Sequence, residues 1–134
     1  MLLKQISVFL ENKSGQLLEI VNVLAANGID LRALSIAEAQ DYGVLRIIVD
    51  KPDETLTLLR SLDWICQANE VLAVTVPDEP GSLTKILTVL AKNNVNMVYT
   101  YAFLSGTAGK ACIVLRVDDN AYAEKLLRDA DIGC

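Results

Sequence analysis

Apolar residues recur with two different periods along this chain of 134 residues. Residues 17–24 and 83–91 place them at i, i+3, i+4 and i+7, which is the buried face of an amphipathic helix. Residues 5–10 (QISVFL) and 71–76 (VLAVTV) are short, partly alternating apolar runs bounded by polar residues, and they predict strands. The order strand, short turn, helix therefore occurs twice along the chain.

The segments after these two helices predict the same further elements in each case. Asn27-Gly28 and Asn93-Asn94 provide the residue types that best tolerate a left-handed helix end. Second strands are expected at 29–39 and 95–104, turns at 40–43 and 105–109, and third strands at 44–49 and 111–117. Second helices follow at 53–62 and 120–130, with Asp53 and Asn120 as the expected N-caps. A fourth strand at 64–68 completes the first series.

The two series are copies of one another. Residues 11–38 align with residues 77–104, and seven of the seventeen positions from Gly15 to Leu31 are identical at this offset of 66. Such an internal repeat fixes the architecture before any local detail does. The sequence predicts an α+β fold of two tandem ferredoxin-like βαββαβ units, residues 1–68 and 69–134, each an antiparallel sheet with both helices on one face.

The second copy differs from the first at its end. The sequence stops at Ile132-Gly133-Cys134, where the fourth strand of that copy should begin. An absent strand would leave the edge at residues 71–76 open, and an open edge favours pairing with another strand. We expect a strand of the first copy, or of another subunit, to cover this edge.

Residues 78–83 (DEPGSL) carry a family resemblance. Together with the preceding strand and a helix that ends in Asn-Asn-Val-Asn, they resemble the ACT domain, whose pattern is Asp-x-Pro-Gly-x-Leu. Residues 12–17 (NKSGQL) are a weaker version of the same pattern. The resemblance covers nearly the whole chain and is strongest to small proteins made of two tandem ACT domains with no attached enzyme.

The resemblance implies a non-catalytic regulatory protein that binds an amino acid or a similar small metabolite at ACT-domain interfaces. In ACT proteins the ligand often lies between the turn after the first strand and the second strand of a partner domain. A homodimer is therefore expected, with ligand occupancy changing how units or chains fit together. The resemblance names neither the ligand nor a regulated partner enzyme.

The residues of the turn support such a site on physical grounds. Unpaired N–H groups at the start of a helix favour an anion such as an α-carboxylate. Gly15 and Gly81 lack a side chain that would block the ligand, and Asp78 could accept from the ammonium group where the first copy has Asn12. The second copy keeps the family motif, and we therefore expect the ligand there rather than in the first copy. The candidate ligand-binding residues are Asn12, Lys13, Ser14, Gly15, Gln16, Leu17, Asn27, Asp78, Glu79, Pro80, Gly81, Ser82, Leu83, Asn93, Asn94 and Asn96.

Each candidate also has a purely structural interpretation. The two glycines could simply permit a tight turn, Asp78 could be a helix cap, and the asparagines are common turn residues. Tyr99, Tyr101 and Phe103 alternate along one strand, either as core or as the wall of a pocket or interface. Trp64 is expected to pack between the copies rather than to contact a ligand.

Composition narrows the function classes. The formal net charge is −5 with no basic cluster, which argues against nucleic-acid binding, and no apolar run has the length of a membrane span. The absence of histidine removes the commonest general base and metal ligand, and no cofactor, metal or catalytic residue is expected. Three widely spaced cysteines and no signal-peptide pattern predict a cytoplasmic protein with reduced thiols. The alternative function is a protein–protein interaction module without a small-molecule ligand.

Overall fold

The computed structural model describes residues 1–11, 13–38 and 41–133. Asn12, Ala39, Gln40 and Cys134 lie outside the described residues. The chain forms two compact units, residues 4–69 (the first unit) and residues 1–3 with 70–134 (the second unit). The division expected from the sequence, 1–68 and 69–134, follows the repeat itself, whereas these units follow contacts in space.

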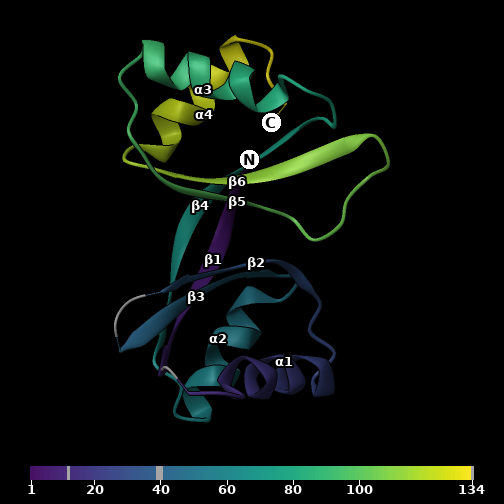
Figure 1. Cartoon of the computed structure of the whole chain (residues 1–134), viewed down its shortest axis with the longest axis vertical. Coiled ribbons are helices and arrows are strands. Elements are labelled where there is room, and N and C mark those ends of the chain that lie inside the picture. Colours follow the sequence, from purple (N-terminus) through teal and green to yellow (C-terminus); the bar gives the residue numbers. More distant parts are fainter. Residues whose placement is uncertain (12, 39–40, 134) are drawn as a thin grey trace. The chain divides into compact units, whose positions relative to one another are not determined.

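The first unit contains both helices and most strands of the first repeat. Its elements are β1 (Leu2–Glu11, from Lys4 onward), α1 (Gln16–Ala26), β2 (Leu31–Glu38), β3 (Tyr42–Val49), α2 (Pro52–Ser61) and the start of β4 (Cys66–Pro77). Strand β3 pairs antiparallel with both β1 and β2. In Figure 1, α1 and α2 lie on the same side of this sheet.

The apolar cluster of the first unit explains this arrangement. Alternate residues of β1 and β3 point to one face, and the helices lay their apolar stripes on it. Burying an Ile or Leu side chain stabilises the fold by about 1.5–3 kcal/mol. The fully or nearly fully buried members from strands and helices are Ile6, Val8, Leu10, Ile20, Leu24, Leu45, Ile47, Val49 and Leu59.

The second unit repeats this design. It contains the rest of β4, then α3 (Ser82–Lys92), β5 (Met97–Ala102), β6 (Lys110–Val117) and α4 (Asn120–Asp129). Strand β6 pairs antiparallel with β4 and β5. Its buried cluster takes the equivalent positions: Leu72, Val74, Val76, Ile86, Leu90, Leu115, Val117, Ala123 and Leu127. The α+β fold of two βαββαβ units is thus confirmed.

The offset between the repeats changes along the chain. It is 66 for α1 and α3, which begin at residues 16 and 82, but 68 for α2 and α4, which begin at 52 and 120. The hairpin between β5 and β6 is therefore two residues longer than its counterpart. The expected caps Asp53 and Asn120 were wrong, because both lie within their helices, and the N-caps are Lys51 and Asp119. Only Asp119 caps through its side chain, which accepts from the N–H of Tyr122 at 3.0 Å.

The expected cover for the edge of β4 is present. Met1 and Ala73 exchange two hydrogen bonds, with the Ala73 N–H donating at 2.8 Å and the amino group of Met1 donating at 3.2 Å. Such an exchange is typical of directly opposed residues in an antiparallel pair. Leu2 packs against the apolar cluster of the second unit. The first residues of β1 therefore belong to the second unit, and they cover this edge at Ala73 as expected, whereas Thr75 of the same edge pairs with Gly133.

Candidate functional site

The turn between β1 and α1 places a glycine at the helix N-cap. Gly15 has φ +88°, in the left-handed region, and no side chain caps the helix. A Cβ added at Gly15 would meet nothing within 4 Å, so the backbone angle, and not lack of space, requires glycine. The first N–H groups of α1 therefore have no side-chain acceptor from the N-cap, as an anion site requires. Gly81 has the same geometry before α3, with φ +94°.

A hollow of about 320 Å³ adjoins this turn in the first unit. We call it the corner hollow, and its lining residues are Leu10, Glu11, Lys13, Gly15, Gln16, Leu17, Ile36, Tyr42 and Gly43. Lys13 and Glu11 form an exposed ion pair at its rim, with 2.7 Å between Nζ and Oε2. Their mutual hydrogen bond and charge lower the pKa of Glu11 and raise the pKa of Lys13, so both charges persist over a wide pH range.

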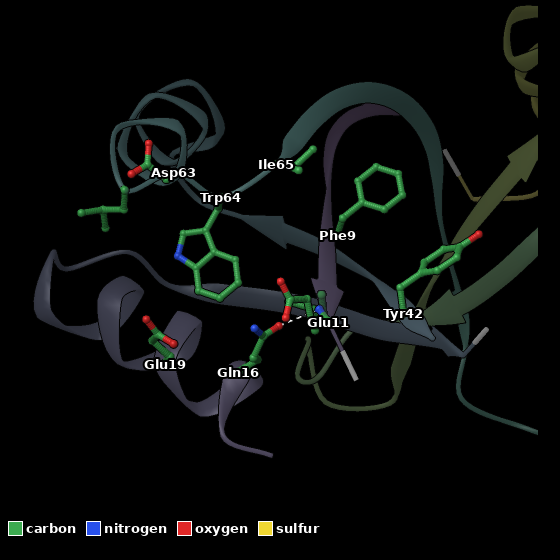
Figure 2. A pocket seen from close by; sticks show the side chains of 10 residues that line it. Phe9, Glu11, Gln16, Glu19, Tyr42, Asp63, Trp64 and Ile65 are labelled. Carbon is green, nitrogen blue, oxygen red and sulfur yellow. Dashed lines mark hydrogen bonds between the residues drawn. The ribbon is translucent and has the colours of Figure 1, made fainter. Parts of the chain in front are cut away.

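A second hollow of about 360 Å³ also has Gln16 in its lining (Figure 2). We call it the Trp64 hollow, and its lining residues are Phe9, Leu10, Glu11, Gln16, Glu19, Tyr42, Leu62, Asp63, Trp64 and Ile65. The Gln16 side chain lines both hollows, and its Oε1 accepts from the N–H of Glu11 at 2.7 Å. This bond fixes the carboxamide at the boundary between the two hollows.

The equivalent turn of the second unit contains a hydrogen bond between the helix start and the preceding strand. The Ser82 hydroxyl, in a buried residue, donates to the carbonyl of Pro77 at 2.6 Å and so ties the helix start to the end of β4. Asp78, Glu79 and Pro80 are exposed there. The counterpart of the Trp64 hollow measures about 180 Å³ and is lined by Val76, Pro77, Ser82, Lys85, Asp131, Ile132 and Gly133; we call it the Ile132 hollow.

The structure brings together some of the residues expected at a ligand site. Lys13, Gly15, Gln16 and Leu17 line the corner hollow, while Ser14 is exposed beside it and Asn12 lies outside the described residues. In the second unit, Ser82 lines the Ile132 hollow and Leu83 is partly exposed on α3. Asp78 is not a helix cap, since Gly81 has that position.

The asparagines lie at the opposite ends of the helices. Asn27 and Asn93 are the C-caps of α1 and α3, and their side chains donate to the carbonyls of Val23 and Val89 at 2.8 Å. Asn94 has φ +57°, and the carbonyl of Asn96 accepts from Asp118. Helices of 11 residues are about 16 Å long, so each asparagine lies that far from the glycine turn of its own unit.

Sequence reasoning did not select Glu11, Glu19, Tyr42 or Asp63, which line the Trp64 hollow, and it expected Trp64 to pack between the copies. Trp64 is half-buried and packs against the first apolar cluster as well as lining the hollow. The signal that could have found this site is the difference between the repeats, because Glu11, Glu19 and Trp64 correspond to Pro77, Lys85 and Ile132. Tyr99 and Tyr101 stack with 6.3 Å between ring centroids and are not part of the cluster beneath α3 and α4.

Metal sites, membrane-spanning helices and reactive thiols were sought among the described residues. No group of three or more His, Cys, Asp or Glu residues in the described segments could hold a metal ion. Across residues 1–11, 13–38 and 41–133, no helix is both long enough and apolar enough to span a bilayer. Burial raises the pKa of the Cys66 and Cys112 thiols, which makes both weak nucleophiles at neutral pH.

Comparison with known proteins identifies relatives of the whole chain. The sequence matches the family described as an ACT domain pair over residues 1–132. Protein BT0572 from Bacteroides thetaiotaomicron is 35% identical, with a TM-score of 0.92 over 99% of this chain and 91% of that one. No curated protein matches the sequence.

Two further solved structures share the fold at lower identity. The ligand-free regulatory subunit of aspartate kinase from Thermus thermophilus is 16% identical, with a TM-score of 0.70 over 96% of this chain and 90% of that one. Aspartate kinase from Clostridium acetobutylicum is 17% identical, with a TM-score of 0.54, and this chain spans 33% of its length. This chain therefore shares its fold with the first structure and with a part of the second.

Proposed function

This chain belongs to the ACT domain pair family, and from that premise we propose that it is a non-catalytic regulatory protein that binds an amino acid or a similar small metabolite. In this proposal it acts in the cytoplasm as a homodimer and regulates a partner enzyme. The fold shared with the regulatory subunit of an aspartate kinase supports a regulatory role. The observation on which ligand binding depends is the corner hollow beside the uncapped start of α1.

The corner hollow has complementary groups for both ends of a zwitterion. The N–H groups at the start of α1, which the N-cap residue does not cap, and the ammonium of Lys13 favour a carboxylate. The ionised Glu11 at the same rim can accept from an α-ammonium group. Leu10, Leu17 and Ile36 provide an apolar wall for a side chain. The proposal therefore assigns the ligand to the first unit, although the second repeat keeps the family motif more fully.

The test is a calorimetric and thermal-shift screen of the twenty amino acids with the full chain and two variants. Gly15→Asn keeps a residue type that tolerates positive φ and places a polar side chain over the start of α1, where it competes with a carboxylate. A ligand at one hundred times its Kd stabilises the wild type by about 2.7 kcal/mol, and Gly15→Asn should lose most of this. Gly81→Asn is the matched control and should keep it. Binding that survives Gly15→Asn unchanged would remove the corner hollow from the proposal.

A protein–protein interaction module is the second candidate. Large apolar side chains are exposed around the Trp64 hollow, where Phe9 is 42%, Tyr42 51% and Ile65 70% exposed. Exposed apolar residues gathered at one place favour contact with another molecule. A screen in which none of the twenty amino acids shifts the melting temperature would favour this candidate over the first.

A further inference from the structure

The two repeats contain the same hollow in two chemically different forms. Each is bounded by the end of the first strand, the first turns of the first helix and the connection that follows the second helix. The connection has a residue with positive φ at the same position in both, Asp63 at +67° and Asp131 at +57°. The Trp64 hollow is nevertheless about 360 Å³ and the Ile132 hollow about 180 Å³. The larger volume lies within the range of small-molecule sites.

The two hollows also differ in the charge of their lining residues. Glu11, Glu19 and Asp63 line the first, and no lining residue described there is basic, so its formal charge is −3. The Ile132 hollow has Lys85 and Asp131, one charge of each sign. Lys13 pairs with Glu11 outside the hollow, whereas the side chains of Glu19 and Asp63 make no hydrogen bond or ion pair with any described residue. Two carboxylates are thus available to a ligand.

The aromatic residues of the lining narrow the class of ligand further. Figure 2 shows the Trp64 ring with the side chains of Asp63 and Glu19 on either side of it, and Phe9 beyond. Phe9 and Tyr42 lie with 6.3 Å between ring centroids. Indole and phenyl faces attract a cation and also bury an apolar chain, while the carboxylates repel any anion. A neutral apolar molecule would leave the carboxylates unpaired.

From this cavity, its aromatic wall and its charge, we propose that the Trp64 hollow binds a small organic cation, an amine or guanidinium with an apolar body. The cationic group contacts Glu19 and Asp63, and the apolar body lies on Trp64. This site is distinct from the corner hollow, although the two share Leu10, Glu11, Gln16 and Tyr42. The Ile132 hollow does not bind such a cation, because Lys85 repels it.

The test is isothermal titration of the full chain with cations and their uncharged analogues. L-arginine and cadaverine should bind, whereas L-citrulline and 1,5-pentanediol, in which neutral groups replace the cationic ones, should bind at least about tenfold more weakly, because hydrogen bonds to a charged group are lost. Glu19→Lys introduces the residue that the second repeat has, and Asp63→Asn removes a charge while keeping a residue that tolerates positive φ. Each should weaken cation binding at least about tenfold. Lys85→Gln in the second repeat is the matched control and should leave it unchanged.

Three results would overturn the proposal: no binding of either cation at about 1 mM, equal binding of citrulline and arginine, or cation binding that Glu19→Lys and Asp63→Asn leave unchanged. The result of this test can be distinguished from the result of the test of amino-acid binding at the corner hollow. Neutral amino-acid binding that Gly15→Asn abolishes and Glu19→Lys leaves intact would support the corner hollow. Cation binding that Glu19→Lys abolishes and Gly15→Asn leaves intact would support the Trp64 hollow, and cation binding that Gly15→Asn abolishes and Glu19→Lys leaves intact would refute it.

Discussion

Thr75 donates its backbone N–H to the carbonyl oxygen of Gly133, with 2.9 Å between the two atoms. Phe9 makes the equivalent bond to Ile65 in the first repeat, also at 2.9 Å. Both bonds hold the connection after the second helix against the first strand of the same repeat. The two positions differ in the room available for a side chain. A Cβ on Gly133 would collide with the carbonyl oxygen of Thr75, whereas the Ile65 side chain is 70% exposed.

Gly133→Ala should therefore destabilise the protein. The added methyl group would collide with backbone rather than with a movable side chain, and such overpacking costs about 1–3 kcal/mol. Urea denaturation would measure the loss in the free energy of unfolding. Ile65→Ala is the matched control, because truncating an exposed side chain changes stability by no more than about 0.5 kcal/mol. Equal effects of the two variants would show that Gly133 is not packed as described.

Gly28 and Asn94 follow the C-caps of α1 and α3 at equivalent positions, with φ +67° and +57°. Gly28→Asn should change the free energy of unfolding by less than about 1 kcal/mol, because asparagine tolerates this region and the second repeat already has it there. Gly28→Val should cost about 1–2 kcal/mol or more, since a branched side chain fits a positive φ poorly. No atom lies within 4 Å of the added Cβ, so the difference would report backbone conformation alone. Urea denaturation of the two variants measures this difference. Equal stabilities of the two variants would contradict the prediction.

Leu2→Ala should weaken the second unit and spare the first. Leu2 is a residue of β1 that packs against the second apolar cluster, and truncating a partly buried leucine costs about 1–2 kcal/mol. Native-state hydrogen exchange should become faster at the Ala73 amide, which pairs with Met1, and stay unchanged at Ile47 in β3. Leu18→Ala, at a residue 63% exposed, is the control for loss of a leucine side chain. Faster exchange at Ile47 alone would refute the assignment of Leu2 to the second unit.

The Cys66 and Cys112 thiols should react slowly with iodoacetamide at pH about 8 in the folded protein. Burial raises the pKa of each above the ordinary value of 9.0, so less thiolate is present in the folded than in the unfolded chain. Labelling should accelerate as the pH rises toward the raised values, and in urea at any pH. A Cys134→Ser background confines the readout to the two described thiols. Equal rates with and without urea would contradict the raised pKa values.

The sequence was sufficient for the fold because two independent signals agree. The repeat at an offset of 66 and the apolar periodicity both predict the order βαββαβ, and the large buried residues of α1, Ile20 and Leu24, have their counterparts in Ile86 and Leu90 of α3. The caps of the second helices were placed wrongly because Asp53 and Asn120, which are common cap types, lie one or two positions inside their helices. In α2, Pro52 also takes the first helical position, which proline favours, and moves the cap back to Lys51.

The candidate site was only partly predictable. The turn glycines follow a motif, so Gly15 and its neighbours could be found from the chain alone. The Trp64 hollow is built from segments that are far apart in sequence, since Phe9, Glu19, Tyr42 and Asp63 belong to four different stretches. Each of these residues has an ordinary structural explanation when it is considered singly. Only their convergence in space distinguishes them.

The membership of Met1–Leu3 in the second unit has a consequence for anyone who wishes to express the repeats separately. A fragment beginning at Glu70 would lack the hydrogen-bond partner of Ala73 and the apolar contact of Leu2. Such a fragment would have an exposed strand edge and a tendency to associate with other copies. A circular permutant that joins the C-terminal end to Met1 would keep all these contacts, and it is the more promising route to an autonomous second repeat.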